Sequence, residues 1–250
     1  MGFSQGDGSA VLVLWDIDHT LIETRGIGRA AFGAAFEQVT GQALQQMPHI
    51  TGRTEPDIYA ATARLHGIRQ PPKFDVFAEA LAAAYIDRQH DLRQRGRTLP
   101  GAANALAHLA DIPRVYQSVL TGNTRAVARI KLETFGLLTH LDLESGAYGD
   151  DDGYRPGLVP IAQSRAADRY MTEFTRHNTV LIGDSPGDIE TAVVGGARVV
   201  AVAAGGTAAS DLTGADRVLN DLTDAQALAQ AVRHPGCAAP ASRDPGGTAG

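Results

Sequence analysis

Three short polar clusters in this sequence combine acidic, hydroxyl and glycine residues at close spacing. Asp16 and Asp18 belong to the first, Thr121-Gly122-Asn123 is the second, and Asp184 and Asp188 belong to the third. Aspartates two residues apart can direct one carboxylate and one backbone carbonyl at a hard cation, and Asp184 adds a second carboxylate. Mg²⁺ prefers such oxygen ligands and keeps several waters, so a substrate phosphate would complete its shell. The Thr121 hydroxyl and the amides of Gly122 and Asn123, at the start of a helix, favour anion binding.

Each cluster follows a short apolar run that we expect to be a buried strand. The strands are expected at Val11–Trp15, Val115–Leu120, Thr179–Ile182 and Val199–Val202, and the helices between and after them at Arg125–Phe135, Leu158–Tyr170, Ile189–Val194 and Ala225–Val232. This alternation predicts an α/β fold with a doubly wound, Rossmann-like parallel sheet. Ligands of such sheets bind at the carboxyl ends of strands, so the three clusters should converge there.

Residues 22–98 interrupt this alternation. They contain helical patterns at Gly28–Val39, Pro56–His66 and Phe74–Arg93 but no convincing buried strand. A segment of this length is too long for a loop inside a compact domain. We therefore expect an inserted α-helical domain at 22–98, a core made of 11–21 and 99–233, and disordered tails at 1–10 and 234–250, where Pro, Gly, Ala and Ser are frequent.

Composition excludes several classes of protein. The net charge of -6 argues against a nucleic-acid binder, which needs a basic face. No apolar run approaches the roughly 20 residues that span a bilayer. The start has no features of a secretory signal, and a single cysteine, Cys237, cannot form an internal disulfide. These features predict a cytoplasmic protein. The oligomeric state cannot be read from the sequence.

The motifs resemble those of the haloacid dehalogenase superfamily of hydrolases, and in particular its phosphatases, such as the phosphoglycolate phosphatases. The DxDxT motif of that family is matched by Asp16, Asp18 and Thr20, its strand-ending Ser or Thr by Thr121, and its GDxxxD motif by Gly183, Asp184 and Asp188. The helical insert resembles the family's cap. The resemblance extends from about Val11 to Leu222.

The resemblance implies a role for each matched residue. Asp16 would attack phosphorus and form an aspartyl-phosphate. Asp18 would protonate the leaving oxygen and then activate the water that cleaves the intermediate. Asp16, the Asp18 carbonyl and Asp184 would bind Mg²⁺, and Asp188 would orient a ligand or a metal-bound water. Thr121 would donate a hydrogen bond to a phosphoryl oxygen.

The lysine that usually forms the family's third motif has no direct counterpart. Arg155, which precedes Pro156 and the expected helix from Leu158, is our candidate for the cation that bridges the nucleophile and the phosphoryl group. Lys131 is a rival, but its position inside a helix favours a solvated side chain. Arg165 is a weaker rival.

Arg53, in the Thr51-Gly52-Arg53-Thr54 stretch of the insert, resembles a residue by which such caps contact substrate. It could bind a second anionic group, and it could equally be a surface arginine.

The sequence thus predicts an Mg²⁺-dependent phosphatase that acts on a small phosphorylated metabolite. One alternative is a phosphosugar mutase of the β-phosphoglucomutase type, which shares these motifs. The other is a non-enzymatic scaffold that binds metal or phosphate. The missing lysine favours the scaffold, whereas the presence of Asp18 argues against it.

Overall fold

The computed structural model describes residues 9–204 and 206–233, and its centre is a parallel sheet. The strands are β1 (Val11–Trp15), β4 (Val115–Val119), β5 (Thr179–Gly183), β6 (Arg198–Val202) and β7 (Arg217–Leu219), in the order β4-β1-β5-β6-β7. Trp15 pairs with Val119 on one side and with Ile182 on the other, so the ends of three strands lie level at one edge. This register brings the polar clusters that follow β1, β4 and β5 together.

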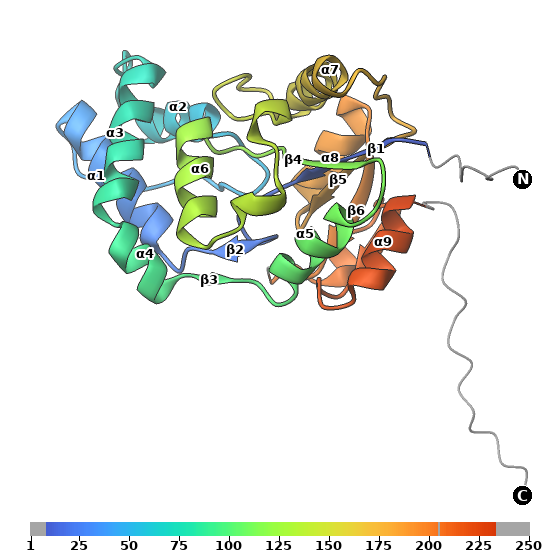
Figure 1. The fold of residues 1–250 in the computed structure, drawn as a ribbon. Coiled ribbons are helices and arrows are strands. Elements are labelled where there is room, and N and C mark those ends of the chain that lie inside the picture. The colour runs from blue at the N-terminus through green and yellow to red at the C-terminus, as the bar shows by residue number, and fades with distance from the viewer. Residues whose placement is uncertain (1–8, 205, 234–250) are drawn as a thin grey trace, which may run out of the picture.

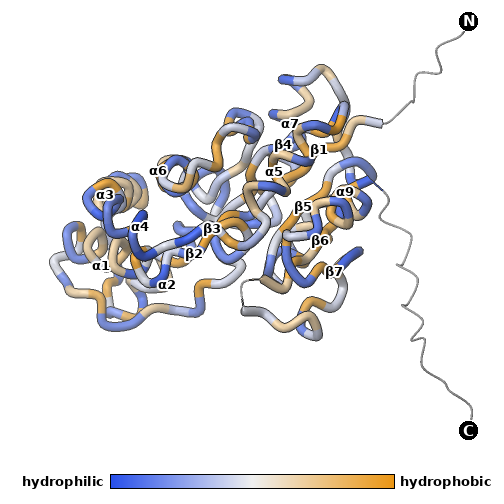
Figure 2. The backbone as a smooth tube through the Cα atoms, turned by 60° about the horizontal axis from the view of Figure 1, so that its bottom comes forward, coloured by the Kyte–Doolittle hydropathy of each residue, from blue (hydrophilic) through white to orange (hydrophobic). Residues whose placement is uncertain are grey.

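Helices cover both faces of the sheet (Figure 1). One apolar cluster packs α5 (Ala102–Ala110), α6 (Arg125–Thr134) and α9 (Ala225–Arg233) against the β1 face that carries Val13 and Trp15. A second packs α7 (Leu158–Tyr170) and α8 (Pro186–Gly195) against the face that carries Leu12 and Leu14. Because both faces are buried, β1 is apolar at every position, and Figure 2 shows β5 and β6 as largely hydrophobic too. The predicted doubly wound α/β fold is confirmed.

The inserted residues form four helices beside the sheet, at the left of Figure 1. These are α1 (Ile27–Thr40), α2 (Glu55–Leu65), α3 (Phe74–Asp87) and α4 (Gln89–Arg95). They have an apolar cluster of their own, in which Phe77 stacks on Tyr59. The single helix expected over Phe74–Arg93 is wrong, because the chain turns at Arg88 and thereby brings Leu92 into this cluster.

Two short strands join the insert to the sheet domain, and the sequence pattern did not predict them. β2 (Ile22–Glu23) pairs antiparallel with β3 (Arg97–Thr98), and the Arg97 guanidinium donates two hydrogen bonds to Glu23. The two connections therefore run side by side. Helix α5 and strand β7 were also not predicted. Four short 3₁₀ helices complete the described elements, at Leu138–His140, Leu143–Ser145, Arg155–Gly157 and Ala209–Asp211.

Most of the two predicted tails, residues 1–8 and 234–250, lies outside the described residues. Ala10, at the end of the predicted front tail, is buried in the apolar cluster of α7 and α8. Within the described part of the chain, none of the helices has both the length and the apolar character needed to cross a membrane.

Candidate active site

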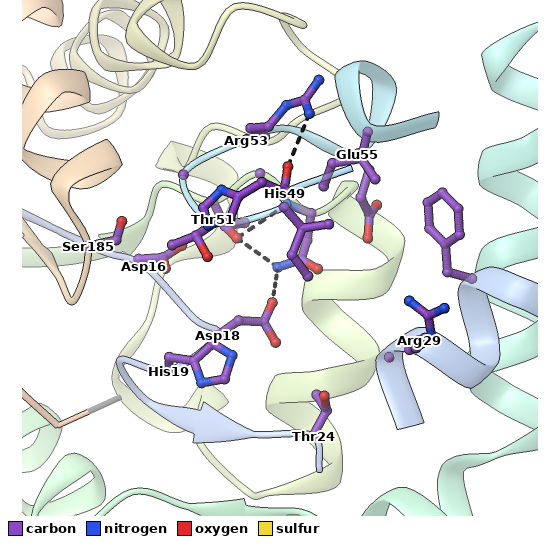
Figure 3. A pocket seen from close by; sticks show the side chains of 18 of the residues that line it. Asp16, Asp18, His19, Thr24, Arg29, His49, Thr51, Arg53, Glu55 and Ser185 are labelled. Atoms are coloured by element: carbon purple, nitrogen blue, oxygen red, sulfur yellow. Dashed lines mark hydrogen bonds between the residues drawn. The ribbon is translucent and has the colours of Figure 1, made fainter. Parts of the chain in front are cut away.

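A cavity of about 490 Å³ lies where the three polar clusters meet (Figure 3). The residues predicted for the site that line it are Asp16, Asp18, Arg53, Thr121, Gly122, Asn123, Arg155 and Asp184. The strand ends supply most of these side chains, whereas the insert supplies the opposite wall. The structure therefore brings the predicted residues together, while their catalytic roles stay predictions.

Arg155 joins two of the aspartates. Its Nη2 atom lies 2.9 Å from Asp16 Oδ1 and 2.6 Å from Asp188 Oδ1, and all three side chains are buried. The Nε atom of Arg155 is buried without a hydrogen-bond partner among the described residues. Arg155 therefore lies next to Asp16 with its Nε–H unpartnered among these residues, and its role as the bridging cation stays a prediction.

Burial disfavours the charged forms of Asp16 and Asp184. Burial raises the pKa of Asp16 well above its usual range, and Asp188 and Asp184 add to the rise while Arg155 opposes it. Burial, together with Asp188, raises the pKa of Asp184 to about 7. The carboxylates of Asp16, Asp184 and Asp188 offer oxygen atoms within 4.8 Å of one another. Buried hard donors of this kind suit a divalent cation.

Asp188 differs from the other two acids because its oxygens already have partners. Oδ1 pairs with Arg155, and Oδ2 accepts hydrogen bonds from the backbone N–H and the hydroxyl of Ser185. Ser185 and Asp188 thus form the capping box at the start of α8. Gly183 makes room for this carboxylate, since a Cβ atom there would lie 2.3 Å from Asp188 Cγ. Asp188 is therefore placed to orient Arg155.

Asp18 has a different set of partners. Its Oδ2 accepts hydrogen bonds from Lys131 Nζ at 2.6 Å and from Asn123 Nδ2 at 2.8 Å. Asn123 Nδ2 also donates to the Thr121 hydroxyl. Burial alone would raise the pKa of Asp18, but Lys131 and Asn123 outweigh it and the net pKa shift is downward.

The expectation that Lys131 is solvated is wrong. The residue is 3% exposed, and its Nζ atom bonds both Asp18 and Asn123 Oδ1. The reason is the rotation of α6, which places Lys131 on the buried stripe with Val127 and Ala128. This helical spacing was a readable signal. Arg165, the other rival, pairs with Asp151 outside the cavity lining.

The loop before α2 brings the insert down onto the core. Arg53 lines the cavity, but its guanidinium donates to Asp57 at 2.6 Å and to the carbonyl of His49, so a substrate anion would compete with a carboxylate already in place. Thr54 Oγ1 donates to the Gly153 carbonyl. A Cβ atom on Gly122 would lie 2.0 Å from the Arg53 carbonyl oxygen, which explains glycine at that position.

Glu55 is a cavity residue that sequence reasoning missed. Its backbone N–H donates to the Gly122 carbonyl, and its Oε2 accepts from the Thr124 N–H at the start of α6. Burial raises the pKa of Glu55 to about 7, against the opposing effect of Lys131. Tyr85, whose ring lies 5.2 Å from Lys131 Nζ, was missed too. No local sequence pattern predicts that Glu55 or Tyr85 lies in the site, because their partners are far away in the sequence.

Comparison with solved structures supports the fold. The chain is similar to a hydrolase from Pseudomonas syringae, with 22% identity, 89% and 99% of the two chains covered and a TM-score of 0.65. It is similar to a CbbY variant from Rhodobacter sphaeroides in complex with xylulose-(1,5)bisphosphate, with 17% identity, 86% and 96% coverage and a TM-score of 0.66. It is also similar to a predicted phosphoglycolate phosphatase from Haemophilus somnus, with 18% identity, 90% and 100% coverage and a TM-score of 0.61. No curated protein sequence matches this chain.

The sequence itself carries the family assignment. The family model for haloacid dehalogenase-like hydrolases matches residues 13–192. This range contains all three polar clusters, Arg155, Lys131 and the helical insert. The chain therefore belongs to the haloacid dehalogenase-like hydrolase family.

Proposed function

We propose that this chain is a magnesium-dependent phosphatase that hydrolyses a small phosphomonoester through an aspartyl-phosphate on Asp16. The observation that carries the proposal is the arrangement around Asp16, which pairs with Arg155 at 2.9 Å and lies within 4.8 Å of Asp184. The Asp16 carboxylate and a phosphate dianion repel each other because both are negative. Positive charge near both groups is therefore needed before Asp16 can attack. Arg155 supplies part of that charge, and a metal ion would supply the rest.

Each side chain of the site would have a separate task in the reaction. Asp16 attacks phosphorus as a carboxylate, and the bond from phosphorus to the leaving oxygen breaks. Asp18 gives that oxygen a proton and later takes one from the water that cleaves the aspartyl-phosphate. Thr121 and the Gly122 and Asn123 amides would bind phosphoryl oxygens. Lys131 and Asn123 hold Asp18 on one side of the cavity.

The donor set fits magnesium, although Asp188 is already engaged. Asp16, the carbonyl of Asp18 and Asp184 would hold the ion, and Thr20 would help to orient Asp184, because its hydroxyl donates to Asp184 Oδ1 at 3.0 Å. When bound, Mg²⁺ would neutralise charge on the transferring phosphoryl group. Asp188, whose carboxylate is fully bonded to Arg155 and Ser185, would act through Arg155.

The size of the cavity supports a small substrate. Its volume of about 490 Å³ suits a metabolite and not a protein segment, and two similar structures are named as CbbY and as a predicted phosphoglycolate phosphatase. We propose that residues 22–98 act as a cap that shields the aspartyl-phosphate from bulk water. We further propose a cytoplasmic location, on the basis of the single cysteine.

A phosphate-release screen over small phosphorylated metabolites, with magnesium and with a chelator, tests the proposal. We expect release from a narrow set of compounds, dependence on magnesium, and complete loss in Asp16→Asn, with the fold retained by circular dichroism. Turnover by Asp16→Asn would exclude Asp16 as nucleophile. Exchange between isomers without phosphate release would instead identify a mutase.

A further inference from the structure

The cavity extends well beyond the residues that would bind a phosphoryl group. In Figure 3, Asp16 and Ser185 lie at one side of the view and Arg29, on α1, lies at the other. Apolar side chains of the insert line much of the wall, namely Phe32, Met47, Pro48, Ile50 and Ile58. A phosphoryl group alone would leave this part of the cavity empty, so there is room beyond it for the remainder of a substrate.

Arg29 differs from the other cationic side chains that line the cavity. Arg155 pairs with Asp16 and Asp188, Lys131 pairs with Asp18, and Arg53 pairs with Asp57. Arg29 has neither an acidic partner nor a side-chain hydrogen bond within residues 9–204 and 206–233. Arg29 is an exposed residue at the edge of the cavity lining, and its positive charge has no acidic partner among these residues.

The surroundings of Arg29 suit an anion. The residue lies in the first turn of α1, where the helix dipole favours negative charge. Phe32 follows three residues later on the same face of the helix and is buried. Figure 3 shows Arg29 on α1, across the cavity from Asp16. A planar guanidinium with free donors matches the two oxygens of a carboxylate or a phosphate.

We propose that Arg29 binds a second anionic group of the substrate, a carboxylate or a phosphate, at the end remote from the phosphoryl group that is transferred. The intervening carbon chain would pack against Phe32 and Ile58. This inference rests on the proposed phosphatase function, and it assigns the substrate to the class of phosphomonoesters with an anionic far end. It also gives to Arg29 the task that the sequence suggested for Arg53.

Binding of non-hydrolysable phosphonates tests this inference without turnover. Isothermal titration calorimetry, in magnesium, compares alkylphosphonates with ω-phosphonocarboxylates and α,ω-bisphosphonates of matched chain length. We expect the best doubly anionic ligand to bind about 10- to 100-fold more tightly than its alkyl counterpart. The preferred series identifies the second group as carboxylate or phosphate.

The variants separate Arg29 from general charge effects. Arg29→Ala should lose the preference for doubly anionic ligands and keep the affinity for alkylphosphonates. Arg93→Ala, which removes an exposed arginine of α4 that does not line the cavity, should keep the preference. An equal affinity of the wild type for both ligand classes, or a preference that survives in Arg29→Ala, would overturn the inference. Preserved anion selectivity together with no phosphate release from any ester would overturn the proposed function and leave the Arg29 site standing.

Discussion

The Nζ atom of Lys131 lies 2.6 Å from a carboxylate oxygen of Asp18. The two aspartates of the first polar cluster thus have separate cations, since Arg155 pairs with Asp16. Lys131 is fixed from several sides, by Asn123 Oδ1 at 2.7 Å and by the ring of Tyr85. The proposed acid–base residue, Asp18, and the proposed nucleophile, Asp16, therefore interact with different cations.

Replacing Lys131 should change how Asp18 exchanges protons. Because Lys131 lowers the pKa of Asp18, Lys131→Met should raise it and move the basic limb of the pH profile of kcat to higher pH. The loss of positioning should also reduce kcat by about 10- to 100-fold. Arg129→Met, an exposed neighbour on α6, is the control and should leave both quantities unchanged. An unmoved pH profile in Lys131→Met would show that Lys131 does not act through Asp18.

Arg155 should be required for both stability and turnover. Arg155→Ala leaves Asp16 and Asp188 buried without their cation, and breaking a buried pair costs about 3–5 kcal/mol, so Tm should fall. Arg155→Lys retains the charge on a shorter side chain, whereas in the wild type the single Nη2 atom of arginine contacts both acids, and we expect the variant to fold with turnover reduced about tenfold or more. Thermal unfolding and phosphate release measure the two effects. A larger loss of turnover in Lys131→Met than in Arg155→Ala would give the bridging role to Lys131.

Magnesium should stabilise the wild type through Asp184. Saturating metal should raise Tm by about 5 °C or more, and Asp184→Asn should lose most of this rise. Without metal at pH 8, we expect Asp184→Asn to have a higher Tm than the wild type. The folded pKa of Asp184 is raised to about 7, so its ionisation destabilises the native state and the neutral asparagine removes that cost. Asp168→Asn, an exposed acid on α7, should respond like the wild type. An Asp184→Asn protein that keeps the full magnesium response would exclude Asp184 as a ligand.

Glu55 should make stability depend on pH. Its folded pKa of about 7 lies above the ordinary 4.5, so the folded state binds more protons than the unfolded one between these values, and stability falls as pH rises through this window. The groups around it are Thr124, which donates to its carboxylate, and Lys131, Asp18 and Tyr85. Glu55→Gln removes the titration and keeps an acceptor for the Thr124 N–H.

The difference in stability between Glu55→Gln and the wild type isolates this group from the other acids. We expect the free energy of unfolding of the variant to rise relative to that of the wild type from pH 5 to pH 8, by at most about 3 kcal/mol. Urea unfolding at several pH values measures the gain. Glu37→Gln, an exposed glutamate of α1, should show no such trend. A constant difference between Glu55→Gln and the wild type would mean that Glu55 ionises normally in the folded protein.

The parts of the fold that follow from local pattern were predictable. β1, β5 and β6 are buried at every position, and β4 is buried over its last three residues. Each polar cluster follows its strand directly, so the convergence of Asp16, Thr121 and Asp184 needed only the rule for parallel sheets. Arg155 could be placed because Pro156 and the start of α7 come next to it.

The parts that depend on contacts between distant segments were not predictable. Lys131 is 113 residues from Asp18, and Glu55 is 69 residues from Thr124, so their burial depends on how α6 and the insert meet. The pairing of Arg53 with Asp57 is local, by contrast, and its i,i+4 spacing was a readable signal. The break at Arg88 has neither a proline nor a glycine to announce it.

The contact between Gly52 of the insert and Gly187 of α8 should govern substrate binding. A Cβ atom on Gly187 would lie 2.5 Å from Gly52 Cα, which must shift the loop that carries Arg53 and Glu55. Gly187 is in the first turn of a helix, where alanine is favoured by up to about 1 kcal/mol, and this gain offsets the cost of moving the loop backbone, so Gly187→Ala should fold with a Tm close to that of the wild type. We expect KM for the best substrate of the screen to rise about tenfold.

Gly153→Ala is the matched control for this prediction, because a Cβ atom there meets open space and the Gly153 carbonyl that accepts from Thr54 is retained. It should keep the wild-type KM. A lowered Tm in Gly187→Ala would mean that the loop contact stabilises the whole fold, and an unchanged KM would mean that substrate binds without it. We expect a raised KM with an unchanged Tm, because the contact of this loop with the core helps to bind substrate and contributes little to the stability of the fold.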